Sequence, residues 1–345
     1  MKKLTNALPL ILSFTVLLSF FSAVGFINVA NAVSKADILY LETGAHPLKE
    51  EIKPKEKEKA ETPKEEASSQ SSSVAASTTT KDAVGKIHEQ FLSPYSQQLN
   101  YNGIYIKNST GLSVNIKNEL NQTLSIKIKK TKEPEVLIVH THATESYMSE
   151  DRAYYTASDK PRSDSDEKNV IKVGEVLATT LKKGGVSVLH DKTHHDSPSY
   201  NQSYSRAKST INEYLKKYPS IKIVVDLHRD AIAMSGNDKC KPTKTINGKK
   251  AAQVMLVVGS ETGTVTGFPN WKQNFRLALR FQQTMEVMYP GLARAMTFCS
   301  RKYNMNLTNG SMLLEVGTEA NTLEEACYSA ELAGNALLSV LNTLK

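Results

Sequence analysis

Residues 134–146 read PEVLIVHTHATES, and this stretch decides which fold the sequence favours. Val136–Val139 is a short, continuous apolar run, which is typical of a strand buried on both faces. Polar residues begin at His140, so the strand should end there and present polar side chains at its carboxyl end. Strands of this kind belong to α/β domains, whose sheets are covered by helices on both faces.

The sequence downstream of this strand alternates between helical and extended patterns. Helical spacing predicts helices at residues 170–181, 200–217, 271–288 and 323–344, and apolar runs predict strands at 186–189, 221–227, 254–258 and 312–316. The first helix is followed by Gly184-Gly185, a C-terminal capping signal. This order predicts an α/β fold with a mostly parallel twisted sheet flanked by helices on both faces.

The N-terminus carries a segment for membrane attachment or export. Lys2 and Lys3 precede Ala7–Ala30, which contains no charged residue and could cross a hydrocarbon core of roughly 30 Å as a single-pass helix. A cleaved signal peptide is the alternative, because Ala30-Asn31-Ala32 is an A-x-A-like cleavage site. Both interpretations place the rest of the chain outside the cytoplasm. They therefore argue against nucleic acid as a partner, although the formal net charge is +8.

Composition divides the rest of the chain. Residues 37–90 are rich in Lys, Glu, Pro, Ser and Ala and contain too few large apolar residues to fold, so we interpret them as a disordered linker. Alternating apolar residues at 104–106, 112–116 and 124–128 predict short strands. The expected organisation is an anchor or signal (1–36), the linker (37–90), a β-rich lead-in (91–132) and the main domain (133–345).

Polar residues at three expected strand ends form a candidate metal-binding set. His142 and Glu145 follow the first strand, His228 ends a later one, and Glu315 lies inside the last. Because the carboxyl ends of parallel strands meet at one sheet edge, we expect these side chains to lie close together. Zinc hydrolases combine His and carboxylate ligands with a carboxylate base. The pattern predicts His142, Glu145 and His228 as metal ligands and Glu315 as the catalytic base.

These residues also have ordinary structural interpretations. A histidine near a strand end is usually a hydrogen-bonded or solvated side chain. Glu315 is harder to explain in this way, since burying an unpaired charge within LLEVG is expensive. Competing chemistries lack their motifs, because the sequence contains no GxSxG, GxxxxGK[ST], GxGxxG or HExxH. The cysteines form no CxxC pair, and we expect buried thiols at Cys240, Cys299 and Cys327.

Five long motifs make the chain resemble the stage II sporulation protein P family of endospore-forming bacteria. They are VLIVHTHATESY (136–147), NVIKVGEVLATTL (169–181), HDSPSYNQSYSRA (195–207), VVDLHRDA (224–231) and LLEVGTEANTLEEA (313–326). The resemblance implies a zinc N-acetylmuramoyl-L-alanine amidase domain at 133–345 that hydrolyses peptidoglycan during forespore engulfment. Endopeptidase activity is also credited to the family. Implied partners are the stage II sporulation proteins D and M, at the cell membrane.

The resemblance extends to the broader zinc amidases and implies roles for single residues. It places the two histidine ligands at His142 and His228 and the catalytic glutamate at Glu315, which is followed by a glycine as in the family. The remaining ligand in these amidases is a glutamate that starts the first helix. Simple alignment would put it at Glu167, but a polar insertion separates that helix from the strand. We favour Glu145, which belongs to the HTHATES motif.

Other polar residues near the motifs are expected to support the site or the fold. His140 and Asp230 would orient the ligands or pair with a neighbouring arginine. His194 and His195 lie in a polar loop and are interpreted as solvated or structural. The basic segment 239–250 could rim a groove for a glycan strand or form a solvated loop.

Two further functions remain open at this point. One is a non-catalytic wall-binding scaffold of the engulfment complex, which would not need a carboxylate base. The other is a zinc peptidase that cuts stem peptides, whose products would differ from those of an amidase.

Overall fold

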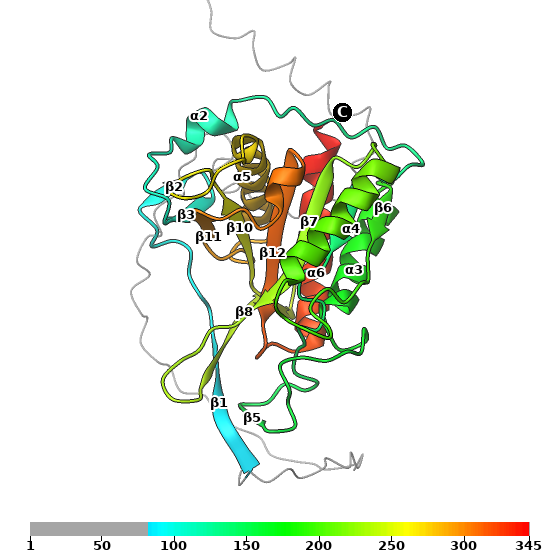
Figure 1. The fold of residues 1–345 in the computed structure, drawn as a ribbon. Coiled ribbons are helices and arrows are strands. Elements are labelled where there is room, and N and C mark those ends of the chain that lie inside the picture. Colours follow the sequence, from blue (N-terminus) through cyan, green and yellow to red (C-terminus); the bar gives the residue numbers. More distant parts are fainter. Residues whose placement is uncertain (1–81, 345) are drawn as a thin grey trace, which may run out of the picture. The chain divides into compact units, whose positions relative to one another are not determined.

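The computed structural model describes residues 82–344 (Figure 1). The expected anchor or signal, and the expected linker up to residue 81, lie outside the described residues. The strands are β1 (Ala83–Gln90), β2 (Leu99–Tyr101), β3 (Ile104–Asn108), β4 (Val136–Val139), β5 (Tyr154–Thr156), β6 (Val188–His190), β7 (Ile223–Asp230), β8 (Lys239–Ile246), β9 (Lys249–Ala252), β10 (Val254–Gly259), β11 (Met296–Cys299) and β12 (Gly310–Thr318). The helices are α2 (Ile116–Leu120), α3 (Val170–Lys183), α4 (Ser203–Lys217), α5 (Trp271–Met288) and α6 (Leu323–Asn342), with a 3-10 turn at Met305–Leu307.

The main sheet has eight strands in the order β2-β3-β11-β10-β12-β7-β4-β6. The prediction of a mostly parallel sheet is wrong, because the sheet is mixed. Strands β12, β7, β4 and β6 run parallel, but β10 is antiparallel to β12, and β2 is antiparallel to β3. The reversal arises because β10 is reached from β7 through the short β8–β9 hairpin, whereas a parallel neighbour would need a crossover connection.

Helices cover both faces of this sheet, as predicted. Along β4, Val136 and Ile138 pack with α3, α5 and α6 in the largest hydrophobic cluster, whereas Leu137 and Val139 face α4. Figure 1 shows α4 on one side of the sheet and α6 on the other. The two-residue period of the strand therefore divides one apolar run between two cores. The hydrophobic clusters lie within residues 82–344, so this part of the chain carries its own core.

The N-terminal part of the described chain differs most from expectation. Residues 83–90, assigned to the linker, form β1 between β5 and β8 in a separate four-stranded sheet. Only Ile87 of this strand is buried. The sequence therefore shows no alternation of apolar and polar residues that would have predicted a strand there. Residues 112–116 form no strand and lead into α2. Residues 124–128 form no strand ladder. Leu124, Ile126 and Ile128 nevertheless face the core, while the residues between them meet solvent.

The basic segment at 239–250 is a hairpin rather than a solvated loop. It forms β8 and the first half of β9, and Cys240–Thr243 are buried. Lys241 is 1% exposed and pairs with Asp151 and with Glu325 at the start of α6. Its charge is thus neutralised inside the protein, and it is not available to an external polymer. No helix of the described residues is apolar and long enough to span a membrane.

Local capping and one irregularity position the functional ends of the elements. The side chain of Asn169 caps α3, and Thr322 with Glu325 forms a capping box on α6. The pairing of β12 with β7 shifts between Glu315 and Thr318, where Gly317 adopts a φ of +64°. A Cβ at Gly317 would lie 2.8 Å from both Ala252 Cβ and Asn321 Oδ1, so glycine is required by space as well as by φ.

A buried glycine in α3 gives the first prediction. A Cβ at Gly174 would lie 2.7 Å from His140 Nε2 and 2.8 Å from His190 Nε2. Although alanine favours a helix by about 1 kcal/mol over glycine, we expect Gly174→Ala to destabilise the protein by about 1–3 kcal/mol through overpacking. Denaturant unfolding measures this. Thr179→Ala, at an exposed position of the same helix, is the matched control and should be neutral or stabilising; a stabilised Gly174→Ala variant would contradict the clash.

Candidate active site

A cleft of about 500 Å³ opens where β4, β7 and β12 end. Its lining includes all four residues predicted for the site, which are His142, Glu145, His228 and Glu315. Three strands far apart in the sequence therefore bring these side chains to one sheet edge, as the strand-end pattern indicated. Segment 239–250 is absent from the lining, so the structure does not place it at the rim.

The register of two parallel strands sets two of the predicted site residues side by side. Glu315 of β12 and His228 of β7 are direct partners in the ladder. Partners in a ladder project to the same face of a sheet, so the carboxyl group and the imidazole share one side. The bulge at Gly317 begins only after Glu315, so the pairing of Glu315 with His228 keeps the regular register.

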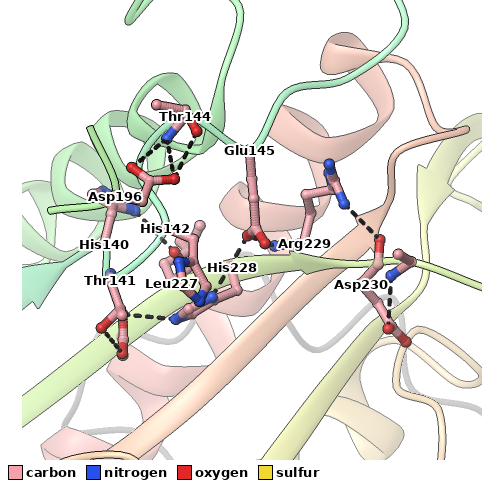
Figure 2. Close-up of polar contacts among 12 residues, drawn as sticks. His140, Thr141, His142, Thr144, Glu145, Asp196, Leu227, His228, Arg229 and Asp230 are labelled. Atoms are coloured by element: carbon pink, nitrogen blue, oxygen red, sulfur yellow. Dashed lines mark hydrogen bonds and ion pairs between the residues drawn. The ribbon is translucent and has the colours of Figure 1, made fainter. Parts of the chain in front are cut away.

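Glu145 points toward His228, as Figure 2 shows. Its Oε2 lies 3.5 Å from His228 Nδ1 and accepts a hydrogen bond of 3.2 Å from the backbone N–H of Arg229. Both side chains are buried. The structure thus brings Glu145 into contact with one of the two predicted histidine ligands.

His142 also lines the cleft, and its ring contacts three aromatic side chains. Its ring centroid lies 5.3 Å from that of His228, at nearly perpendicular planes. Tyr200 stacks on the other side at 4.4 Å with an interplanar angle of 11°, and Tyr204 meets the ring edge-on at 5.5 Å. Ser203 Oγ lies 3.3 Å from His142 Nδ1. The imidazole is therefore held by residues at and just before the start of α4.

The charges around His228 make it a site for a cation. Burial alone would lower the pKa of His228, but the carboxylates of Asp226 and Glu145 outweigh it and hold that pKa well above its ordinary value. Burial would raise the pKa of Glu145, but His228 and then Arg229 lower it. Two buried carboxylates and one imidazolium proton thus form a compact cluster, in which a divalent cation could replace the proton.

Glu315 is the least satisfied carboxyl group of the cleft. Its Oε2 is buried and has no hydrogen-bond partner among the described residues. Burial raises its pKa to about 8; the nearby charge on Glu145 also raises it, while His228 lowers it. A carboxyl group with this pKa gains and releases a proton near neutral pH, which suits general acid–base chemistry.

The donor set fits zinc in its chemistry. His142, His228 and Glu145 supply two imidazoles and a carboxylate, the usual ligands of a catalytic zinc site. His228 Nε2 forms an ion pair with Asp226 Oδ1 at 2.9 Å, but without hydrogen-bond geometry, so this buried nitrogen has no hydrogen-bond partner among residues 82–344. In the described part of the chain, however, no three His, Cys, Asp or Glu side chains are arranged as a metal-binding group. The side chains are instead ion-paired with one another.

The alternative carboxylate ligand lies elsewhere. Glu167 is largely exposed, its Oε2 lies 2.9 Å from Lys172 Nζ, and it does not line the cleft. Glu145 is therefore the carboxylate that the fold places with the two histidines.

The expected supporting residues contact other groups than predicted. The carboxylate of Asp230 accepts a hydrogen bond of 2.8 Å from Arg294, whereas the side chain of Arg229 donates only to the backbone oxygen of Asp230, at 3.4 Å. His140 lies beneath the cleft, where it contacts Leu227 O and His190 and no predicted ligand. His194 and His195 are structural: His194 Nε2 lies 2.8 Å from Asp166 Oδ1, and the buried His195 donates to His140 O.

Sequence reasoning missed two residues that line the cleft, Arg162 and Tyr200, and one that lies beside it, Asp226. Asp226 precedes His228 by two positions on the same strand, a spacing that places both on one face and could have been noticed. Arg162 comes from the polar insertion and lies 3.9 Å from Glu145 Oε1 and 2.6 Å from Asp196 Oδ2. The guanidinium of Arg162 also stacks on Tyr200. No local pattern marks Arg162 or Tyr200, because their positions depend on loops folding over the sheet edge.

The pair His140–His190 gives a prediction for acid stability. His140 Nδ1 donates to Leu227 O over 2.9 Å, so its Nε2 must accept from His190 Nε2 at 2.8 Å. Burial lowers the pKa of His140 to about 3 and that of His190 to about 4, from 6.5. The unfolded chain then binds more protons below about pH 6.5. The stabilisation is complete above that pH and is lost as pH falls toward 4 and 3.

The measurement is denaturant unfolding at pH 7 and pH 5. We expect His190→Gln to reduce the loss of stability between these pH values by about 1–2 kcal/mol. His88→Gln, which removes only an exposed ion pair with Asp238, is the control and should change the loss less than His190→Gln does. An equal effect of both variants would show that the pair does not titrate as described.

Comparison with known proteins places the chain in a family. The family model described as Stage II sporulation protein P (SpoIIP) matches residues 17–337. The Stage II sporulation protein P of Bacillus subtilis (strain 168) is 29% identical over 211 residues, which cover 58% of this chain and 49% of that protein. The chain thus spans about half the length of the curated relative it matches.

Among solved structures, the CwlD amidase from Clostridioides difficile in complex with the GerS lipoprotein is 12% identical. The match covers 61% of this chain and 98% of that one, with a TM-score of 0.38. The N-acetylmuramyl-L-alanine amidase Ami1 from Mycobacterium smegmatis is 10% identical over 62% of this chain and 99% of that one, with a TM-score of 0.36. Because the family model covers most of the sequence, including every residue of the cleft, the chain belongs to the stage II sporulation protein P family.

Proposed function

We propose that the protein is a zinc-dependent peptidoglycan hydrolase that cuts the amide between N-acetylmuramic acid and L-alanine. The observation that carries the proposal is the convergence of His142, Glu145, His228 and an unpartnered Glu315 in one cleft. A non-catalytic scaffold gives no reason to keep a buried carboxyl group without a partner, since such a group costs stability. Family membership supports a role in sporulation.

Glu315 would act as the base and then as the acid. Its Oε2 is buried beside His228 and has no competing hydrogen bond, so it is free to accept a proton from an attacking water. The same oxygen can then give that proton to the departing L-alanine nitrogen. Because its pKa is about 8, a nearby cation would lower it toward the value that a base needs at neutral pH.

His142, Glu145 and His228 would hold the zinc ion. Zinc, when bound, supplies Lewis-acid chemistry that makes water more acidic and polarises an amide carbonyl. The chain's contribution is to fix these donors. Tyr200 stacks on His142, and the backbone N–H of Arg229 binds the carboxylate of Glu145. Asp226, held by the backbone and the hydroxyl of Thr141, lies beside His228.

The cellular setting is part of the proposal. The uncharged segment Ala7–Ala30 would anchor the chain in the cell membrane, or act as a signal whose cleavage releases it. The described domain would then work outside the cytoplasm, in the septal or intermembrane space, during forespore engulfment. The stage II sporulation proteins D and M are the proposed partners there.

The test is metal content and digestion of purified peptidoglycan by the chain from residue 33, beside His142→Ala. We expect one equivalent of zinc and new amino-terminal L-alanine, both lost in the variant. Mass spectrometry of the products separates this outcome from cleavage within the stem peptide, which would indicate a peptidase. Folded, zinc-supplied protein that binds no metal and releases no product would overturn the hydrolase and leave the wall-binding scaffold.

A further inference from the structure

The sheet edge opposite the cleft carries an unusual concentration of exposed lysines. We call it the lysine edge; it consists of Lys127, Lys129, Lys130, Lys132, Lys182, Lys183, Lys216, Lys217 and Lys222. The region thus holds nine of the chain's 43 lysines and arginines, and none of the nine lines the cleft.

The topology brings these lysines together. Helices α3 and α4 each follow the carboxyl end of a strand and run back, so their last residues reach the amino edge of β4 and β7. Figure 1 shows residues 121–133 running along that edge. Three hydrogen bonds join the segments there: Lys130 Nζ to Gly184 O, Ser220 Oγ to Pro134 O, and Asn309 Nδ2 to Ser125 Oγ.

None of the nine lysines forms an ion pair with a described residue. The lysines that do are Lys172, Lys239, Lys241, Lys249 and Lys250. The carboxylates nearest in sequence are Glu133, Glu135 and Glu213, and Glu135 is buried and bound by the backbone N–H groups of Lys129 and Thr131. Glu175 and Glu331 line a pocket with Lys183, but together with Glu133 and Glu213 they set four carboxylates against nine lysines. Positive charge is therefore in excess at the lysine edge, which is expected of a surface that meets a polyanion.

The cleft at the opposite edge carries charges of both signs. Its lining combines Glu145, Asp230, Glu315 and Glu319 with Arg162, Arg229 and His228, and Arg229 is bound by Glu319 and by backbone carbonyls. A negatively charged surface would therefore attract the lysine edge and turn the cleft away from itself. Three of the lysines, Lys127, Lys129 and Lys222, also line a groove of about 620 Å³ with Leu215 and Pro219, large enough for a phosphate-bearing head group.

We propose that the lysine edge binds the surface of an anionic phospholipid bilayer and so points the cleft away from the membrane. The orientation argument rests on the proposed function, because a wall hydrolase must present its cleft to the wall. If the lysine edge bound an anionic wall polymer instead, the cleft would face the wrong way. The attraction between the lysines and an anionic bilayer does not depend on whether the protein hydrolyses the wall.

The length of the chain permits this orientation. The described domain begins at β1, which extends beyond the carboxyl edge of the sheet near Asn237. The residues between Ala30 and Ala83 could span at most roughly 170 Å. A domain of this size has a radius of gyration of about 18 Å. A tether to the membrane could therefore pass the whole domain and leave the lysine edge free to bind the bilayer.

The experiment is co-sedimentation of the chain from residue 33 with vesicles. One set contains phosphatidylglycerol and phosphatidylcholine in equal amounts, and the other contains phosphatidylcholine alone. The test variant replaces Lys127, Lys129, Lys216 and Lys217 with Gln. The matched control replaces Lys107, Lys160, Lys168 and Lys302, which are equally exposed but lie away from the lysine edge, so the change in net charge is the same.

We expect binding only to the anionic vesicles, lost at high salt, and reduced at least tenfold in the test variant but little in the control. Equal loss in both variants would show a general charge effect and overturn the proposal. Binding to isolated anionic wall polymer with none to the vesicles would also overturn it. Peptidoglycan digestion by both variants in solution should match the unmodified chain, so a failure of the proposed function is recognised separately.

Discussion

Glu315→Gln is expected to lower peptidoglycan hydrolysis at least about 100-fold, the usual contribution of a general acid–base group. The amide has the same shape but cannot accept the proton from water. Since Glu315 Oε2 has no hydrogen-bond partner among the described residues, the substitution breaks no bond at that atom. It also removes a buried carboxyl group whose pKa is raised to about 8 by burial. Stability should therefore be unchanged or higher, which separates a chemical from a structural loss.

The measurement is release of amino-terminal L-alanine, with zinc content and thermal unfolding recorded for the same samples. Glu319→Gln is the matched control, because Glu319 also lines the cleft but pairs with Arg229 and Lys239. It should retain most of the activity. Hydrolysis at the full rate by folded Glu315→Gln would remove Glu315 from the mechanism.

Glu145→Gln is expected to abolish zinc binding, whereas Glu167→Gln should leave it intact. Glu145 is buried 3.5 Å from His228 Nδ1, but Glu167 is exposed and pairs with Lys172. Removing the Glu145 charge takes away a proposed ligand and one of the two carboxylates that hold positive charge at His228. We expect zinc affinity and hydrolysis each to fall at least about 100-fold, more than the loss of a supporting residue causes.

Titration with zinc and a competing chelator measures this pair of variants. Zinc retained in Glu145→Gln and lost in Glu167→Gln would reverse the assignment and show that the first helix supplies the ligand. Loss in both variants with loss of the folded state would point to stability, which unfolding curves recorded without zinc distinguish.

The cleft was predictable in its main residues because each one is marked locally. His142, Glu145 and His228 follow buried apolar runs directly, and Glu315 interrupts one. The choice between Glu145 and Glu167 needed the structure, since the two lie at opposite ends of an insertion whose path no local pattern describes. For the same reason the sequence did not show that Arg162 would reach Glu145.

The fold was predictable where periodicity and caps agree. Helices α3, α5 and α6 lie close to the expected ranges, but α4 begins at Ser203, because residues 197–202 carry Tyr200 over the cleft. Strand direction was not predictable in this way. An apolar run such as Val254–Gly259 is equally compatible with both directions, and only the β8–β9 hairpin before it sets the antiparallel one.

The two sheets also determine when this protein can fold. Near the end of β3, Ser109 bonds to Phe298, 189 residues further along the chain, and near β1, His88 contacts Asp238 at a separation of 150 residues. At synthesis rates of about 5–20 residues per second, the early strands wait roughly 10–40 s for partners. A chain with such distant pairings remains unfolded until most of it has been made. Late folding of this kind would suit the proposed export, since an unfinished sheet offers no rigid body to a translocation channel.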